Sequence, residues 1–378
     1  MIPDSYAKCL LATVIFSMPT ASMHGQPRWT LDPQPVLEIA SESQGPNTLF
    51  TRIAHVEQLR TGELIVLDGA TRELRFFDAR GRFIRKIGRN GAGPGEFRET
   101  SGVAIAGDQI HVFDGSSKRI TRFDLAGTLR STIIVAEPPD ARRGIWSYTL
   151  GGFIDDRPVF LASGFPSRNS APPRYTDSLP QYIYSADAAT ARPIGEMALM
   201  DAFFESPKNK GDVIFGRFTS SAVGGGRLYV TDGGRFEVRV YDKSGTRLST
   251  ISRDIPMSRV SESDFDDYVT YRMQFARTSS RSVMRERLSP VPRAEHRPSI
   301  SELLVDDRKN VWIRHWSVQG SRPSTWSVLN ESGRLLAELT MPARFKPVTI
   351  RGDVVAGVFL DDDDVEGIRL LRVRSTVK

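Results

Sequence analysis

The sequence predicts an all-β protein, a single six-bladed β-propeller. Three observations lead to this class. A unit of short apolar strands recurs six times in the 378 residues. Several copies follow one another at about 40–50 residues, which is the length of a propeller blade. A spare strand near the N-terminus is available to complete the last unit. The composition is that of a globular chain, because 39% of the residues are hydrophobic and 25% are charged.

The first unit shows the repeat most clearly. An apolar strand at Leu64–Asp68 ends in aspartate, a second strand follows at 72–78, and a third follows at Phe83–Ile87. Polar and apolar residues alternate in the second strand, which is typical of a strand with one more polar side. Asp78 and Gly81 predict the tight turn between the last two strands, because aspartate bonds backbone N–H groups and glycine adopts a positive φ.

Six copies of this unit are present. Their apolar strands begin at Leu64, Ile110, Val159, Leu228, Val311 and Val354. The intervals are 46, 49, 69, 83 and 43 residues, so the long third and fourth intervals predict insertions. A further strand-like segment precedes each copy and brings each unit to four strands. These segments are residues 53–59, 103–106, 148–154, 218–223, 303–305 and 348–350.

The sixth unit shows only three strands, whereas residues 35–40 form an unassigned strand at the other end of the chain. We expect this segment to pair with the last blade, because that pairing closes the ring and covers an open sheet edge. The predicted propeller domain is residues 34–376. A β-sandwich is the alternative, but it does not explain six equivalent units.

Two segments interrupt the repeat. Residues 137–180 are rich in proline and serine and predict a loop over most of their length, with residues 146–154 as the inner strand of the third unit. Residues 261–296 predict a helical insertion, because Ser261 and Asp264 suit a capping box and apolar residues then follow at helical spacing. A second short helix is predicted at 280–288. We expect a helical hairpin over one mouth of the propeller, as a lid or docking element; the alternative is a helix packed on the outer wall.

The glycine-rich segment at 87–97 carries a family resemblance. It reads Ile-Gly-Arg-Asn-Gly-Ala-Gly-Pro-Gly-Glu-Phe. Together with the repeated Phe-Asp-x-x-Gly turns, it resembles the linkers between blades in bacterial exported six-bladed propellers of the NHL-repeat-like and TolB-like kind. The resemblance covers nearly the whole chain and implies the fold. It implies no single activity, because such propellers include lyases, lactonases, sugar oxidoreductases and binding modules. The segment is not a phosphate loop, because it lacks the Gly-Lys-Ser/Thr ending and a following helix.

Residues 1–25 predict a signal peptide and therefore export, to the periplasm or the outside. Lys8 precedes a short apolar stretch at 9–18, and small residues follow up to Gly25. A disordered leader is the alternative. Cys9 is the only cysteine, so neither a disulfide nor a cysteine-ligated zinc is expected. No later apolar run is long enough to span a membrane.

Candidate ligand-binding residues come from the starts of the inner strands, which surround the axis of a propeller. Aligning the six units places these residues at equivalent positions: Arg52, Glu99, Ser147, Arg217, Ser299 and Lys346. Three cations against one anion favour an anionic ligand such as a carboxylate, a phosphate or an acidic sugar. The alternative is that these residues form salt bridges with one another across a solvated pore.

The sequence therefore favours an exported binding or scaffold module. Its ligand, an anionic small molecule, a glycan or a protein, is expected at the central funnel or under the helical insertion. The alternative is a lyase or hydrolase acting on an anionic small molecule in the funnel.

No metal or other cofactor is expected. The four histidines that follow the leader lie at non-equivalent positions, residues 361–364 lack EF-hand spacing, and no Gly-x-Ser-x-Gly motif occurs. The net charge of +6 is scattered along the chain, so nucleic acid is not an expected partner. A monomer is expected.

Overall fold

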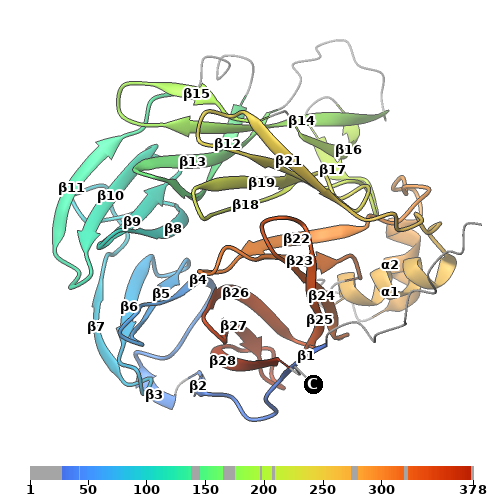
Figure 1. Cartoon of the computed structure of the whole chain (residues 1–378). Coiled ribbons are helices and arrows are strands. Elements are labelled where there is room, and N and C mark those ends of the chain that lie inside the picture. Colours follow the sequence, from blue (N-terminus) through green and yellow to red (C-terminus); the bar gives the residue numbers. More distant parts are fainter. Residues whose placement is uncertain are drawn as a thin grey trace, which may run out of the picture.

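Six antiparallel sheets surround a common centre in the computed structural model (Figure 1). The structure describes residues 28–41, 43–137, 145–164, 175–195, 198–206, 209–273, 280–318 and 322–375. The all-β class and the six-bladed propeller are confirmed. The predicted signal peptide, residues 1–25, lies outside the described residues.

Four blades have four strands each, which follow one another in the sheet in chain order. Blade 1 consists of β4 (Ile53–Gln58), β5 (Leu64–Asp68), β6 (Glu73–Phe77) and β7 (Phe83–Ile87). Blade 2 consists of β8 (Thr100–Ala106), β9 (Gln109–Asp114), β10 (Arg119–Asp124) and β11 (Leu129–Ile134). Blade 4 consists of β18 (Ser220–Gly224), β19 (Arg227–Thr231), β20 (Glu237–Tyr241) and β21 (Arg247–Ser252). Blade 5 consists of β22 (Ile300–Val305), β23 (Val311–His315), β24 (Ser324–Leu329) and β25 (Leu335–Met341).

Blade 3 is larger and corrects one prediction. Its strands are β12 (Ile145–Ile154), β13 (Arg157–Gly164), β14 (Tyr175–Ala186), β15 (Ala191–Pro193), β16 (Ala198–Ser206) and β17 (Asn209–Asp212). The single fourth strand predicted at 194–199 is wrong, because β15 pairs with the end of β14 and β16 pairs with its beginning. The twelve residues of β14 provide room for both partners. Residues 175–180, predicted as loop, therefore belong to the sheet.

Blade 6 closes the ring. Its own strands are β26 (Phe345–Arg351), β27 (Val354–Leu360) and β28 (Glu366–Ser375). The N-terminal strand β2 (Leu37–Ile39) pairs with β28, which confirms the predicted closure by residues 35–40. A second N-terminal strand, β1 (Trp29–Leu31), pairs with the end of β28 and lies before residue 34. The following strand, β3 (Ser43–Pro46), leads into blade 1.

The first strands of the blades form the inner wall. The strands β4, β8, β12, β18, β22 and β26 each contact the first strands of both neighbouring blades. The two neighbouring blades cover both faces of the middle strands of a blade. The strand β5 is accordingly buried along its whole length. This burial on both sides explains why the apolar strands of the repeat are nearly continuous in hydrophobic residues.

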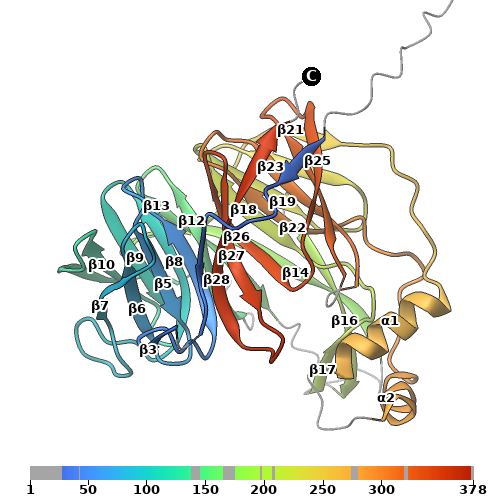
Figure 2. The same cartoon turned by 90° about the horizontal axis from the view of Figure 1, so that it is seen from below.

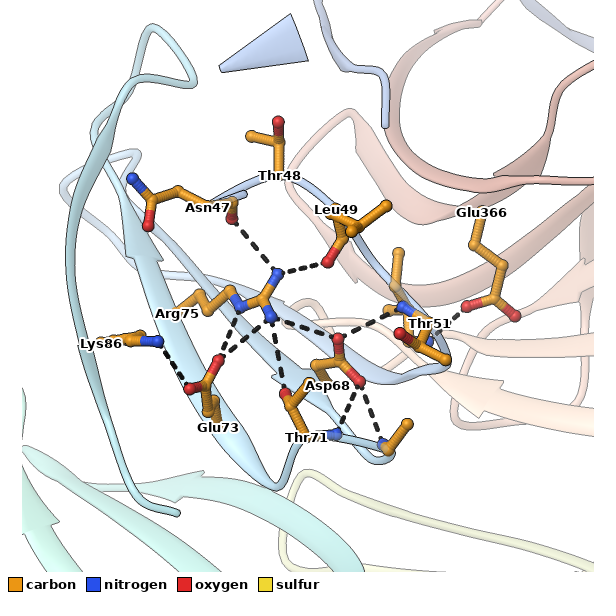
Figure 3. A network of polar contacts seen from close by, with 12 residues as sticks. Asn47, Thr48, Leu49, Thr51, Asp68, Thr71, Glu73, Arg75, Lys86 and Glu366 are labelled. Carbon is orange, nitrogen blue, oxygen red and sulfur yellow. Dashed lines mark hydrogen bonds and ion pairs between the residues drawn. The ribbon is translucent and has the colours of Figure 1, made fainter. Parts of the chain in front are cut away.

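A buried ion pair fixes the linker between β3 and β4 onto blade 1 (Figure 3). The Arg75 Nη2 atom lies 3.4 Å from Asp68 Oδ2, and the two side chains are 5% and 0% exposed. Arg75 also donates to Glu73 Oε2 at 3.0 Å and to the carbonyls of Leu49, at 2.7 Å, and Asn47, at 3.3 Å. Arg75 thereby connects the linker between β3 and β4 to the second and third strands of blade 1.

The helical insertion contains α1 (Glu262–Met273) and α2 (Arg281–Leu288). The predicted capping box is present: the Asp264 N–H donates to Ser261 Oγ at 3.2 Å, and the Ser261 N–H donates to Asp264 Oδ2 at 2.8 Å. The helices pack on Ile214 and Phe215, in the linker between blades 3 and 4, and on Trp316, which follows β23 of blade 5. Figures 1 and 2 show them on the outer side of the ring, close to β16 and β17 of blade 3. They flank the mouth of the ring and do not lie over it as the sequence suggested.

Stability is expected to depend on pH through His111, which is 4% exposed and whose ring centroid lies 4.3 Å from that of Phe153. Burial, with help from the charge of Arg122, lowers the pKa of His111 to about 4. The unfolded chain therefore takes up this proton at a higher pH than the folded protein. Between pH 7 and pH 5 the protein is expected to lose about 1–2 kcal/mol of unfolding free energy through His111.

Chemical denaturation at the two pH values tests this expectation. His111→Gln should lose correspondingly less stability over the same interval, because it removes the titrating ring. An identical pH dependence in wild type and variant would contradict the assignment.

Candidate functional site

Five of the six residues predicted at the funnel occupy equivalent positions at the starts of inner strands. Four of them directly precede the β-bulge of their strand: Arg52, Glu99, Ser299 and Lys346. Arg217 holds the corresponding position in blade 4. The residue after it, Phe218, donates its N–H to the Asp232 carbonyl at 3.1 Å, just as the residue after Arg52, Ile53, pairs with Asp68 in blade 1. The backbone of Ser147 lies within β12, and its side chain is outside the described part of the chain.

The six positions do not form one cluster. Arg52 and Lys346, from neighbouring blades, both act electrostatically on Glu366. Ser299 Oγ donates to the Gly234 carbonyl at 3.4 Å, and Gly234 lines the same pocket as Arg217. Within the described residues, no ion pair joins two of the predicted residues. The alternative arrangement, in which these residues form salt bridges with one another, is therefore absent from this part of the chain.

Two carboxyl groups near this ring were missed by sequence reasoning. Glu302 lies in β22, just after the bulge, and Glu366 begins β28. Burial raises the pKa of both carboxyl groups, while the positive charge of Lys346 acts in the opposite direction. These two acidic side chains offset the predicted excess of cations. Glu366 gave no signal in the repeat alignment, because it comes from the third strand of its blade.

A cleft of about 230 Å³ lies between the propeller and the helical insertion. It adjoins the start of β18, and five aromatic side chains line it: Phe215, Phe218, Tyr268, Tyr271 and Trp316. Phe215 packs edge-on against Tyr268 and Trp316, with ring centroids 5.5 and 5.4 Å apart. The cleft thus has a rigid aromatic wall built from α1 and two loops of the propeller.

An ion pair forms the polar side of the cleft. Arg217 donates to Asp201 from Nη2 at 2.8 Å and from Nε at 3.1 Å, and its backbone N–H donates to the same carboxylate at 2.9 Å. Ser178 Oγ accepts from Arg217 and donates to Asp201. Burial opposes ionisation of Asp201, but the Arg217 and Ser178 hydrogen bonds prevail and lower the pKa of Asp201. The same pairing raises the pKa of Arg217, so both groups are charged at neutral pH.

The local backbone positions the aromatic wall. A turn at 213–216 is closed by the Gly216 N–H on the Val213 carbonyl at 2.9 Å. Within this turn Phe215 has a φ of 62°, an uncommon value for a bulky residue. Ile214 exchanges backbone hydrogen bonds of 2.9 Å with Pro292 and Ala294, just after α2. The insertion therefore holds the turn in this conformation, and backbone strain of this kind is common at binding sites.

A second pocket, of about 400 Å³, adjoins the first, and Arg217 lines both. Its other polar residues are Thr231, Asp232, Arg235, Glu237 and Arg239. Within the described residues the Arg235 side chain makes no hydrogen bond or ion pair. Arg217 is the residue that the two pockets share.

The described residues contain no group of three or more histidine, cysteine, aspartate or glutamate side chains arranged to hold a metal ion. In the acidic turn at 361–364, Asp361 Oδ1 instead accepts the N–H groups of Asp363, at 3.0 Å, and Val365, at 2.9 Å. No described helix has the length and apolar character of a membrane span.

Comparisons with known proteins agree with the fold. A family model described as a 6-bladed β-propeller, DUF5128, matches residues 46–137, which contain blades 1 and 2. A DUF4221-family protein of Bacteroides vulgatus is 12% identical, with a TM-score of 0.50, over 93% of this chain and 100% of that one. A search of the curated proteins found none that matches.

Two further solved structures are less similar. A Bacteroides fragilis protein named as exported is 11% identical over 92% of this chain and 96% of that one, with a TM-score of 0.48. The virginiamycin B lyase of Staphylococcus aureus is 11% identical over 93% and 90%, with a TM-score of 0.40. At these identities the likeness concerns the fold alone, and the function has to be argued from the site.

Proposed function

We propose that this protein is an exported binding module whose ligand occupies the cleft beside the helical insertion. One observation carries the proposal: five aromatic side chains and the Arg217–Asp201 pair line a single cleft at the edge of the propeller mouth. Concave sites with an aromatic wall and a few fixed polar groups are the usual form of a small-molecule site. Export rests on the signal-like residues 1–25.

Exposure supports this choice of cleft. Phe218 is 59% exposed, whereas Phe215 in the same cleft is buried and the other three aromatic side chains are half-buried. An exposed phenyl ring beside a concave surface provides apolar contact area to a ligand without the cost of a rearrangement. Because Arg217 is already neutralised by Asp201, shape and hydrogen bonding rather than charge select the ligand of this cleft.

A second candidate is a lyase or hydrolase that acts on an anionic molecule in the central funnel. It is favoured by Lys346, which lies near two carboxyl groups with raised pKa values, Glu302 and Glu366. A cation that binds an anionic substrate next to a carboxyl group with a raised pKa is a common catalytic arrangement. Arg52, which also acts on Glu366, would assist binding.

A thermal-shift screen tests the first proposal. The probes are neutral saccharides, citrate, inorganic phosphate, benzoate and lactones. A binder is expected to raise the melting temperature of the mature protein, and Phe218→Ala should remove that shift, because the truncation deletes apolar contact area in the cleft. Leu248→Ala is the matched control, since Leu248 is 49% exposed on β21 and lies outside the cleft.

The outcomes separate the two candidates. A shift that survives Phe218→Ala and disappears in Arg52→Ala or Lys346→Ala would contradict the cleft and favour the funnel. Turnover of a lactone or another probe that is lost in the same two variants would establish the enzyme.

A further inference from the structure

The cleft has one apolar wall and one polar side, and this combination restricts the class of ligand. The aromatic wall suits a flat apolar face. The polar side offers both charges of the Arg217–Asp201 pair together with the hydroxyl groups of Ser301 and Ser317. A sugar ring has the matching form, because its C–H groups form an apolar face and its hydroxyl groups point outward from the ring edge. A wholly apolar ligand would offer no hydrogen bond to Arg217 Nη1, which has no partner among the described residues.

The electrostatics of the cleft favour a neutral ligand. Asp201 accepts three side-chain donors and one backbone donor, so its charge is compensated within the protein. Arg217 Nη1 makes no hydrogen bond with a described residue, and it remains available to donate to a ligand hydroxyl. Asp212 is exposed at the rim and adds an acceptor. Paired donors and acceptors without a surplus of positive charge suit hydroxyl groups better than a carboxylate or a phosphate.

The second pocket determines the length of the ligand. Arg217 lines both pockets, so a ligand chain that extends from the aromatic cleft past this side chain reaches the second pocket. The neighbouring pocket holds about 400 Å³ and presents Arg235, whose side chain is without a described partner, together with Glu237 and the apolar Met257. The second pocket therefore combines polar and apolar side chains, as the aromatic cleft does. A single small ring would leave this pocket empty.

We propose that the ligand is a neutral linear saccharide, with one sugar unit in the aromatic cleft and the next unit across Arg217, beside Arg235. This proposal rests on the proposed function, because it assigns the ligand class of the same cleft. It commits to a carbohydrate chain, and an anionic metabolite or a peptide counts against it.

The test is titration of the mature protein with maltose, cellobiose, lactose and chitobiose, followed by calorimetry and saturation-transfer NMR. At least one disaccharide is expected to bind with a Kd on the order of 1 mM, the strength usual for a polar ligand of this size. Its monosaccharide is expected to bind about fivefold more weakly, because the second pocket is then unused. Saturation transfer should be strongest on the C–H protons of one ring.

Two variants assign the two sugar units. Phe218→Ala should weaken monosaccharide and disaccharide alike, whereas Arg235→Ala should weaken only the disaccharide and so reduce the fivefold ratio to about one. Unchanged melting temperatures verify that both proteins fold, since Phe218 and Arg235 lie at the protein surface. Ile134→Ala, a change at a 69% exposed residue of blade 2, is the control.

Three results would contradict the saccharide assignment or both proposals. Binding of citrate or benzoate alone, with sensitivity to Phe218→Ala, would overturn the saccharide assignment and leave the cleft as the binding site. Saccharide binding that neither variant alters would place the site elsewhere and overturn both proposals. Absence of saturable binding by every saccharide tested would overturn the saccharide assignment.

Discussion

Asp68→Ala is expected to lower the free energy of unfolding by about 2–4 kcal/mol, because it removes the fully buried carboxylate beside the Arg75 guanidinium and leaves that group paired with Glu73 alone. Asp68 is fully buried and also accepts backbone N–H groups from Thr51, at 3.3 Å, Ala70, at 3.0 Å, and Thr71, at 3.3 Å (Figure 3). The substitution therefore removes the ion pair and, at the same time, the carboxylate that accepts these three backbone N–H groups. Urea denaturation followed by circular dichroism measures the loss.

Asp114→Ala in blade 2 is the matched control for this experiment. Asp114 accepts the corresponding backbone N–H groups, but its nearest cation, Arg119, lies 4.0 Å away and is bound to the carbonyls of Ala92 and Glu96. We expect a clearly smaller loss there. In the double variant Asp68→Ala/Arg75→Met part of the stability should return, because the buried guanidinium that lost its Asp68 partner is gone. Equal losses in the two aspartate variants would contradict a special role for the Asp68–Arg75 pair.

Ile39→Asp is expected to cost at least about 4 kcal/mol and to open the ring, because it buries an unpaired carboxylate between the first and last blades. Ile39 is 1% exposed and packs in one cluster with Phe77 of blade 1 and Ile368 of blade 6. The apolar side chain therefore contributes to closure in addition to the backbone pairing of β2 with β28. Denaturation and limited proteolysis of the N-terminal segment provide the measurement.

Val36→Asp is the control for ring closure. Val36 lies three residues earlier in the same segment and is 47% exposed, while its backbone N–H donates to the Leu370 carbonyl at 2.8 Å. The substitution keeps that hydrogen bond and buries no charge, so a change within about 0.5 kcal/mol is expected. A loss at Val36 as large as that at Ile39, or no loss at Ile39, would contradict a specific contribution of the buried Ile39 side chain to closure.

The strands were predictable because their signal is local. The middle strand β5 is buried on both sides, so its residues are apolar, and its boundaries agree with the prediction. The turn at Asp78 and Gly81 also forms as expected, with the Gly81 N–H donating to the Asp78 carbonyl at 2.8 Å. Blade 3 departed from its predicted pattern because β14 carries two successive partners, and the choice of a partner strand is not encoded in local periodicity.

The candidate site was only partly predictable. Arg217 was found because the repeat places it at the start of an inner strand. Its partner Asp201 was not found, because it lies in β16, one of the strands added to blade 3. Tyr268 appeared in the sequence only as part of the apolar pattern of a helix. Its role in the wall of the cleft follows from the packing of α1 against the turn at 213–216.

The sequence by itself determined the repeat, the number of blades, the closing strand and the helical insertion, because each depends on spacing and hydrophobic pattern along the chain. Only the tertiary structure decided that the helices flank the mouth, that Glu302 and Glu366 accompany Lys346, and that Arg217 is neutralised by Asp201. These relations join side chains from different strands and blades. Their proximity arises when the ring closes and the insertion packs, and a single sequence contains no local pattern that records it.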